Sequence, residues 1–263
     1  MAIHDIIKCG GGFVIGMVHC LPLPGTMHYG GSCEAVIEHA LRDAKTLEAC
    51  GVDALIVENM GDTPFAAKLD LVQSNALAVI AAKVREAVKI PVGIDAAFND
   101  YESSLSIAHI IGAEFVRIPV FVDTVEFYGG FLYPCARECM RYRKNLGAEN
   151  VMILADVQVK HTNMVLPHVT IESSARNAAD CGADAIIVTG TAIGQETPIE
   201  LIERVKKVVS VPVIAGSGVK EGNIREQFRI ADGAIVGSAL KEGGKLENPI
   251  SEELTKRLLA ARG

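Results

Sequence analysis

Short apolar runs alternate with longer amphipathic stretches along the whole chain. The apolar runs are typical of strands that are buried on both faces of a parallel sheet, and the amphipathic stretches are typical of the helices that connect such strands. The predicted strands are 13–19, 54–58, 92–95, 115–118, 151–156, 185–189, 213–215 and 234–236. The predicted helices are 33–50, 70–89, 101–111, 134–147, 171–181, 198–208, 221–229 and 251–262.

The number of these units predicts the architecture. Eight strand–helix units within 263 residues, or roughly thirty residues each, fit a (β/α)8 TIM barrel better than an open doubly wound sheet. Several predicted helices end at a glycine, as at Gly51 and Gly112, because glycine tolerates the left-handed conformation that stops a helix. No linker-like tract or change in composition divides the sequence, so we expect one α/β domain over residues 1–263.

Composition excludes several classes of protein. The chain has 25 basic and 32 acidic residues, a net charge of −7, and no basic block that could follow a phosphate backbone, so we expect no nucleic-acid partner. No apolar stretch is long enough to cross a membrane, so we expect no membrane partner. Seven cysteines without a Cys-x-x-Cys pair fit a reducing compartment, and we expect a cytoplasmic protein.

Polar residues follow almost every predicted strand, at the end where the active sites of TIM barrels are built. They are His19, Glu58, Asn59, Asp95, Asn99, Arg117, Asp156, Lys160, His161 and Thr189. For any single acidic residue among them, a structural hydrogen bond to a neighbouring loop is an alternative to a functional role. The substrate-binding candidates are Asn59, Asn99, Arg117, His161 and Thr189.

The segment from Asp156 to His161 places an acid, an amine and an imidazole just beyond a buried strand. Lys160 can act as an acid, a base or a Schiff-base amine, and His161 can carry protons. The alternatives for Lys160 are a charge contact with the substrate and a structural bridge to Glu58 or Asp95. We expect an acid–base group at this end of the barrel, and its catalytic candidates are Asp156, Lys160, Glu58, Asp95 and His19.

Small residues directly follow the last two predicted strands. Gly216-Ser217-Gly218 comes after one strand and Gly237-Ser238 after the other, and a short helix is expected to begin near Ser238. Backbone amides exposed by glycines beside a helix start form a cradle for a phosphate group, and TIM barrels often bind phosphate at these two loops. A lone Gly-Ser-Gly is more typical of a tight turn. The pair favours phosphate binding at Gly216, Ser217, Gly218, Gly237 and Ser238.

Oxygen and nitrogen donors from different strands raise the question of a metal ion. The candidate ligands are His19, Glu58, Asp95, Asp156 and His161. They would suit magnesium, manganese or zinc, but they form no compact ligand motif, and they serve equally well as hydrogen-bonding partners of sugar hydroxyls. A divalent metal is therefore a candidate cofactor, and the sequence establishes none.

Aromatic residues gather in the segment 120–134, which follows the fourth predicted strand. They are Phe121, Phe127, Tyr128, Phe131 and Tyr133. Such a concentration favours a subunit contact or a packed lid over a cofactor site. We therefore expect the protein to form a homo-oligomer.

A series of strings along nearly the whole chain resembles the BtpA/SgcQ family. They are Ile15-Gly16-Met17-Val18-His19, Pro22-Leu23-Pro24-Gly25, Gly51-Val52-Asp53-Ala54-Leu55-Ile56-Val57-Glu58-Asn59, Arg141-Tyr142-Arg143, Ala155-Asp156-Val157-Gln158-Val159-Lys160-His161, Asp184-Ala185-Ile186-Ile187-Val188-Thr189-Gly190 and Gly216-Ser217-Gly218-Val219. The resemblance implies a phosphate-binding TIM barrel. The resemblance also implies a role in photosystem I biogenesis, for which the cyanobacterial branch of the family is named.

Two segments depart from that photosynthetic branch. Where the branch usually reads Gly-Ile-Asn-Val-Leu-Arg-Asn, this chain has Gly93-Ile94-Asp95-Ala96-Ala97-Phe98-Asn99. Arg117-Ile118-Pro119-Val120 stands where the branch usually reads Arg-Val-Asn-Val. Both departures fall where a ligand would sit, which favours a divergent, non-photosynthetic member of the family.

The ring of polar strand-end residues favours an enzyme, because a scaffold has no need of such a ring at one mouth. We expect an isomerase, epimerase, aldolase or lyase that acts on a small phosphorylated, sugar-phosphate-like metabolite. Nicotinamide redox chemistry is less compatible, because no Gly-x-Gly-x-x-Gly motif follows a predicted strand. The alternative is a non-catalytic assembly or regulatory factor that has kept the barrel.

Overall fold

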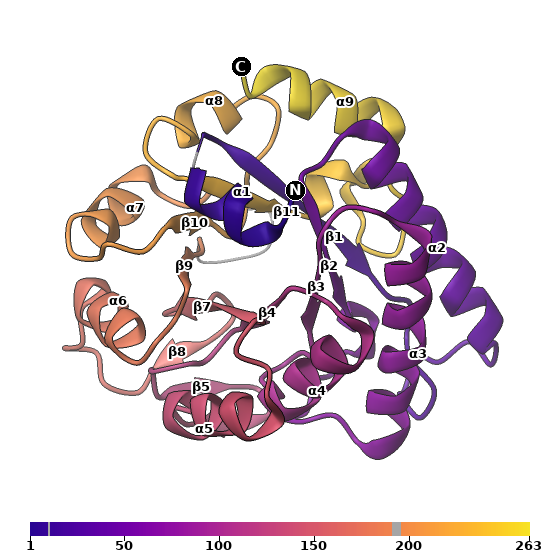
Figure 1. Ribbon diagram of the computed structural model, residues 1–263, viewed down its shortest axis with the longest axis horizontal. Helices are drawn as coiled ribbons and strands as arrows, with labels where there is room; N and C mark the ends of the chain where they lie inside the picture. Colours follow the sequence, from indigo (N-terminus) through magenta and orange to yellow (C-terminus); the bar gives the residue numbers. More distant parts are fainter. Residues whose placement is uncertain (10, 191–195) are drawn as a thin grey trace.

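Eight parallel strands close into a barrel in the computed structural model, which describes residues 1–9, 11–190 and 196–263 (Figure 1). The strands are β1 Phe13–His19, β2 Ala54–Glu58, β3 Val92–Asp95, β4 Phe115–Ile118, β7 Met152–Val157, β9 Ala185–Val188, β10 Val213–Ala215 and β11 Gly233–Val236. Around the barrel they follow the order β1-β11-β10-β9-β7-β4-β3-β2. The predicted (β/α)8 barrel is confirmed.

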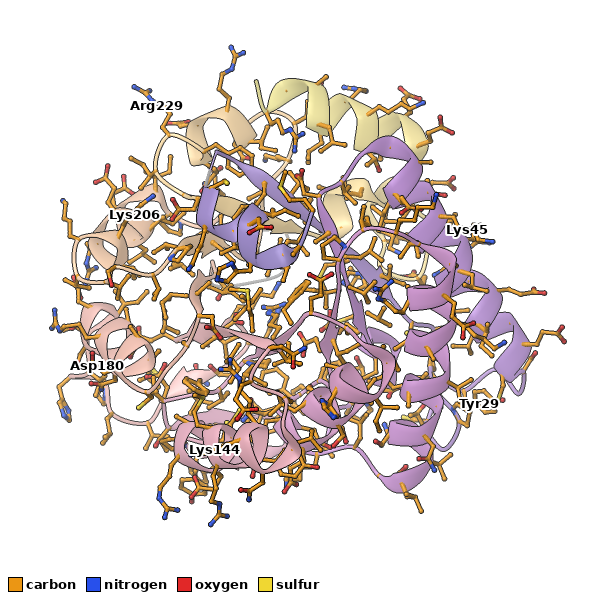
Figure 2. The ribbon with its side chains drawn as sticks, in the orientation of Figure 1. Tyr29, Lys45, Lys144, Asp180, Lys206 and Arg229 are labelled. Carbon is orange, nitrogen blue, oxygen red and sulfur yellow. The ribbon has the colours of Figure 1, made fainter. Side chains whose placement is uncertain are left out.

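Helices surround the barrel on its outer side (Figure 1). They are α2 Cys33–Cys50, α3 Leu71–Ala87, α4 Tyr101–Ile111, α5 Ala136–Leu146, α6 Ile171–Asp180, α7 Ile199–Lys206, α8 Ile224–Gln227 and α9 Glu252–Ala261. Gly51 and Gly112 end α2 and α4 with φ of 94° and 66°, as predicted. Figure 2 shows Lys45, Lys144 and Asp180 pointing outward from α2, α5 and α6. No helix within the described residues is long and apolar enough to cross a membrane.

Apolar side chains pack in two layers, because successive strand residues point alternately into the barrel and toward the helices. Ile15, Ile56 and Leu154 belong to the inner layer. A short N-terminal helix that the sequence pattern did not predict, α1 (Ile3–Cys9), adds Ile3 and Ile7 to this inner layer. It closes the end of the barrel at which the strands begin (Figure 1). We call the opposite end, at which the strands finish, the mouth.

A small antiparallel sheet stands over the mouth and was also not predicted. Its strands are β5 Val125–Phe127, β6 Gly130–Leu132 and β8 Asn163–Met164, in the order β6-β5-β8. It is built from the loops after β4 and β7, and it has an apolar cluster of its own, to which Val125, Phe127 and Val159 belong. Three single turns of 3-10 helix complete the chain: η1 Met60–Asp62, η2 Ser238–Leu240 and η3 Glu242–Gly244.

All seven cysteines carry free thiols. Cys135 and Cys139, which lie one helical turn apart at the start of α5, are buried. Burial raises the pKa of the Cys135 thiol to about 12, so the thiolate that would bind a metal or react is suppressed. Both side chains therefore pack as thiols in the apolar core.

Candidate active site at the barrel mouth

A cavity opens at the mouth, and the loops that follow the strands form its walls. Most of the residues that the sequence singled out line this cavity: His19, Glu58, Asp95, Arg117, Lys160, His161, Gly216, Ser217, Gly218, Gly237 and Ser238. They come together although they are spread over more than 200 positions of sequence, because the carboxyl ends of parallel strands meet at one end of a barrel. Asn59, Asn99, Asp156 and Thr189 lie next to the cavity without lining it.

The ion pair between Arg117 and Asp156 forms the base of the charged part of the site. Arg117 Nε donates to Asp156 Oδ1 over 2.8 Å and Arg117 Nη2 donates to Oδ2 over 2.9 Å. Burial opposes the positive charge of Arg117, but Asp156 overrides it and raises the arginine pKa above its ordinary value. Asp156 is fully buried, and both of its oxygens are occupied. Its place is therefore behind Arg117, where it positions the guanidinium, in place of the direct catalytic contact that the sequence suggested.

Asp95 has an unusual environment beside this pair. Its side chain is 1% exposed, and neither carboxyl oxygen has a hydrogen-bond partner among the described residues. Arg117 Nη1 lies 3.7 Å from Asp95 Oδ2. Burial, followed by the negative charge of Glu58, raises the pKa of Asp95 well above its ordinary value. The raised pKa favours the protonated form of Asp95, and in that form the group can donate a hydrogen bond into the cavity.

Glu58 has the opposite tendency. Burial alone would raise its pKa, but the hydrogen bond and charge of His19 and the charge of Arg117 outweigh burial and lower it. His19 Nε2 lies 3.5 Å from Glu58 Oε2, and His19 Nδ1 is buried without a hydrogen-bond partner in the described part of the chain. Glu58 is thus a buried carboxylate close to a buried carboxylic acid, an arrangement that separates a base from an acid.

Lys160 reaches the same group of charges from the loop after β7. Desolvation, followed by the positive charge of Arg117, lowers its pKa, and the carboxyl groups of Glu58, Asp156 and Asp95 oppose this shift. The Lys160 amide donates to Thr189 Oγ1 over 2.9 Å. Thr189 therefore fixes the backbone of this loop, in place of the substrate contact expected from the sequence.

The loop that carries Lys160 is held in an uncommon backbone conformation. Gln158 and His161 have φ of 48° and 66°, in the left-handed region that non-glycine residues seldom adopt. Asp123 Oδ2 accepts the Gln158 amide over 2.8 Å, and Asp123 Oδ1 accepts the Ser174 hydroxyl over 2.6 Å. Asp123 is 5% exposed, and sequence reasoning missed it because it follows β4 without standing at the strand end.

Asn59 and Asn99 brace the loops around the cavity. Asn59 Oδ1 accepts the Ala97 amide over 2.7 Å, and Asn59 Nδ2 donates to the Ala97 carbonyl over 3.0 Å. Asn99 makes the equivalent pair of bonds to Val120, at 2.8 and 3.0 Å. Both amide groups are buried and engaged with backbone, so the structure gives them a bracing role where the sequence suggested substrate binding.

The predicted phosphate loops face the cavity from β10 and β11. Within the described residues, no hydrogen-bond acceptor takes the backbone amides of Gly218, Val219, Ser238 and Ala239. All four residues line the cavity, and η2 begins at Ser238 as the sequence predicted. A Cβ atom on Gly237 would lie 2.8 Å from His19 Cε1, so glycine is required there for the ring of His19 to pack. We call these four amides the amide cradle.

A metal ion finds no ligand set here. Among residues 1–9, 11–190 and 196–263, no group of three or more histidine, cysteine, aspartate or glutamate side chains is arranged to hold a metal ion. Asp156, one of the candidate ligands, is committed to Arg117. A divalent metal at this mouth stays a prediction from the sequence.

Apolar side chains also line the cavity, and the sequence analysis did not identify them as part of the site. Met60, Phe65, Phe98 and Leu246 line it. Phe98 stacks on Phe127 with ring centroids 5.0 Å apart and ring planes 16° apart. The available signal was the presence of two phenylalanines in the loops that directly follow the second and third strands. We call Phe65 and Phe98 the aromatic wall.

The sequence matches the family model described as BtpA family over residues 12–262. An uncharacterized protein of Pyrococcus furiosus is 42% identical over 247 residues, which cover 94% of this chain and 93% of that protein. The photosystem I biogenesis protein BtpA of Synechocystis sp. is 39% identical over 241 residues, which cover 90% of this chain and 83% of that protein.

Solved TIM-barrel enzymes share the architecture. One is (S)-3-O-geranylgeranylglyceryl phosphate synthase from Thermoplasma acidophilum, in complex with its substrate sn-glycerol-1-phosphate. The likeness has a TM-score of 0.62 and 15% sequence identity, and it covers 99% of this chain and 98% of that chain. At this identity the likeness shows the fold alone.

Proposed function

The chain belongs to the BtpA family, and on that premise we propose that it is an enzyme acting on a small phosphorylated, sugar-phosphate-like metabolite. The proposed reaction is of the isomerase or epimerase type, with aldolase or lyase chemistry as the variant that Lys160 would allow. The observation that carries the proposal is the pairing of a buried carboxylate, Glu58, with a buried acid, Asp95, in a cavity that also presents the amide cradle.

The acid–base pair supports a proton transfer next to a carbonyl group. Glu58 would take a proton from the carbon beside the carbonyl while Asp95 gives its proton to the carbonyl oxygen, which leaves an enediol. For an isomerase, Glu58 would then give its proton to the former carbonyl carbon while the hydroxyl of the neighbouring carbon gives its proton to Asp95, so the carbonyl moves by one carbon and both side chains regain their starting state. An epimerase would need a second acid on the opposite face of the reacting carbon, a role that Lys160 would fill, and Glu58 and Lys160 would then exchange protons with water. Arg117, 3.7 Å from Asp95, would stabilise the carboxylate that Asp95 becomes. Positioned acids and bases of this kind contribute roughly 10²–10⁴-fold in rate.

Lys160 supports the lyase variant. A lysine whose pKa is lowered has a larger fraction of neutral amine, and the amine can attack a carbonyl carbon and release water to form a Schiff base. Borohydride reduces such an adduct to a stable secondary amine on Lys160. An acid–base role for Lys160 leaves no adduct, so trapping separates the two variants.

The amide cradle supports the choice of a phosphorylated substrate. Four amides without partners among the described residues, presented by two adjacent loops, match the acceptor oxygens of a phosphate group. Binding a phosphate that does not react provides energy that orients the reacting carbon over Glu58 and Asp95. The same arrangement would hold a triose, pentose or hexose phosphate.

A non-catalytic role in assembly is the second candidate. The Synechocystis relative is named for photosystem I biogenesis. The exposed aromatic side chains of Tyr128, Phe131 and Tyr133, on the small sheet and just after it, favour contact with another protein. A purely structural role leaves the Glu58–Asp95 pair without a purpose, and for that reason we rank it second.

Exchange of substrate hydrogen with solvent deuterium tests the enzymatic proposal. A panel of triose, pentose and hexose phosphates is incubated with the protein in D2O and followed by NMR. We expect deuterium to enter the carbon beside the carbonyl of a phosphorylated sugar at least about 100-fold more slowly with Glu58→Gln than with the wild-type chain. The unphosphorylated sugar is the matched control. No exchange in any panel member, or equal exchange in both forms of the sugar, would contradict the proposal.

A further inference from the structure

The order of strands places Phe98 across the mouth from the part of the amide cradle that follows β10. In the closed ring β1-β11-β10-β9-β7-β4-β3-β2, four steps separate β10 from β3 in either direction, whereas β11 is three steps from β3. The amide cradle follows β10 and β11, whereas Phe98 follows β3. Glu58, Asp95 and Arg117 stand at the ends of β2, β3 and β4, at the base of the same cavity.

Phe98 is held rigidly as part of this wall. One face of its ring stacks on Phe127, and the Phe65 ring centroid lies 6.2 Å away at 48°. The backbone on either side is fixed as well, because Asn59 binds both the amide and the carbonyl of Ala97 and Asn99 binds those of Val120. A ring that is fixed before the ligand arrives loses little conformational entropy on binding, so contact with it contributes to affinity efficiently.

The other side chains of this wall add no charge. Met60, Phe65 and Leu246 line the cavity together with Phe98. A phosphate on the β10 part of the cradle leaves the other end of an extended ligand near Phe98, across the mouth. A hydroxylated or charged group there would lose hydrogen bonds with water and gain few in return. A planar ring would bury apolar surface and continue the stack of Phe98 on Phe127.

We propose that the substrate carries a planar, unsaturated ring at the end opposite its phosphate, and that this ring binds against Phe98. The reacting carbon then lies between the two ends, over Glu58 and Asp95. The inference rests on the proposed function, because it takes the amide cradle as the phosphate site. It narrows the substrate class from sugar phosphates in general to phosphate esters that also bear an aromatic or heteroaromatic group.

Binding of matched phosphate monoesters tests this inference without knowledge of the substrate. Benzyl, 2-phenylethyl and 4-phenylbutyl phosphate are compared by calorimetry with methyl, ethyl and butyl phosphate, so that the two members of each pair differ only by the ring. We expect the ring to tighten binding about tenfold at one tether length, a gain that stacking and buried area together readily supply. Cyclohexylalkyl phosphates of the same length are expected to gain clearly less.

Two variants test whether the gain in affinity from the ring comes from contact with Phe98. Phe98→Leu keeps apolar volume but removes the aromatic face, and it is expected to abolish most of the tenfold gain while affinity for butyl phosphate changes less than twofold. Phe131→Ala removes an exposed aromatic ring, 59% exposed, that does not line the cavity, and it is expected to change neither affinity. Because Phe98→Leu is a mild change, retained binding of butyl phosphate also reports that the variant is folded.

The outcomes separate the inference from the function on which it rests. If alkyl phosphates bind but the ring adds nothing at any tether length, or if cyclohexyl and phenyl esters bind equally, the planar-ring inference is wrong and the phosphate site stands. If Phe98→Leu weakens alkyl and phenylalkyl esters alike, the wall is not the ring site. If neither inorganic phosphate nor any alkyl phosphate binds, the proposed function itself fails.

Discussion

Asp95 shows how burial, with the negative charge of Glu58 beside it, can raise the pKa of a carboxyl group. A carboxyl group that is 1% exposed and has no hydrogen-bond partner among the described residues keeps its proton at a pH at which an exposed aspartate loses it. Glu58 remains charged in the same cavity because His19 and Arg117 compensate for its burial. The chain thus obtains an acid and a base from two similar side chains at the ends of neighbouring strands.

The raised pKa of Asp95 predicts a dependence of stability on pH. Between about pH 4 and its raised pKa, the folded state keeps a proton that the unfolded state releases, so wild-type stability falls as pH rises. Asp95→Asn removes this penalty, which amounts to about 1.4 kcal/mol for each unit of pKa shift. We expect the variant to gain melting temperature over wild type at pH 8 and to gain less at pH 4, as measured by calorimetry. An equal difference at both pH values would show that Asp95 is ionised in the folded protein.

Lys160→Met tests the role of the amine. The lysine faces three carboxyl groups and Arg117, and methionine keeps its length without its charge or proton. We expect turnover to fall by about 10²–10⁴-fold, the contribution of a positioned acid or base. Affinity for inorganic phosphate should change much less, because the amide cradle is untouched. Turnover within a few-fold of wild type would show that Lys160 has a structural role and no catalytic one.

Sequence reasoning found the charged residues of the site and misjudged several of their neighbours. Glu58, Asp95 and Arg117 follow from a simple rule, because the carboxyl ends of parallel strands meet at one mouth. The bracing role of Asn59 could not be predicted from that rule, because its partner, Ala97, lies 38 positions away on another loop. Whether a polar side chain faces a ligand or a backbone group depends on contacts that periodicity does not encode.

The loop after β7 is the element on which the placement of Lys160 depends. Two residues with positive φ, Gln158 and His161, flank the lysine, and Asp123 holds the first of them from the loop after β4. Such a conformation persists only where its surroundings enforce it. Asp123 is therefore a positioning residue, which acts on the chemistry through the backbone of another loop.

Asp123→Ala should release this loop. The variant loses the bonds to the Gln158 amide and the Ser174 hydroxyl, so Lys160 becomes better solvated and its pKa moves up toward the ordinary value. The pH midpoint of Lys160 labelling by an amine reagent, measured by mass spectrometry, is expected to rise. Asp123→Asn keeps an acceptor and should restore part of the shift. An unchanged pH midpoint in Asp123→Ala would show that Asp123 does not control the environment of Lys160.

Most elements of the fold were predictable from the sequence, but helix α1 and the small sheet of β5, β6 and β8 were not. The apolar runs located all eight barrel strands to within a residue at their ends, because buried parallel strands are continuously apolar. Strands β5, β6 and β8 have two or three residues each, which is too short for an alternating pattern to be recognised. They pair segments up to 39 positions apart, as between Val125 and Met164.

The outer surface of the molecule carries a cluster of exposed aromatic side chains on one side of the mouth. Tyr128, Phe131 and Tyr133 are 61%, 59% and 68% exposed, and Val165 and Leu166 of the loop after β8 are also exposed. We propose that this surface is where two copies of the chain meet, because large exposed apolar side chains gather at contact surfaces.

Sedimentation equilibrium at micromolar concentration tests the association. We expect a mass of at least twice 28.0 kDa for the wild-type chain. Phe131→Glu, which places a charge within the surface, is expected to shift the mass toward the monomer, whereas Lys144→Glu, an exposed change on α5, is the control. A 28.0 kDa monomer for the wild-type chain would leave the aromatic surface as a lid over the mouth.

The central claim is that one mouth combines a phosphate cradle with a buried acid–base pair, and crystals soaked in inorganic phosphate test it most directly. We expect one phosphate ion within hydrogen-bonding distance of the Gly218 and Ser238 amides, in the cavity that Glu58 and Asp95 also line. A phosphate bound elsewhere at the mouth, with these amides engaged by protein acceptors, would contradict the claim.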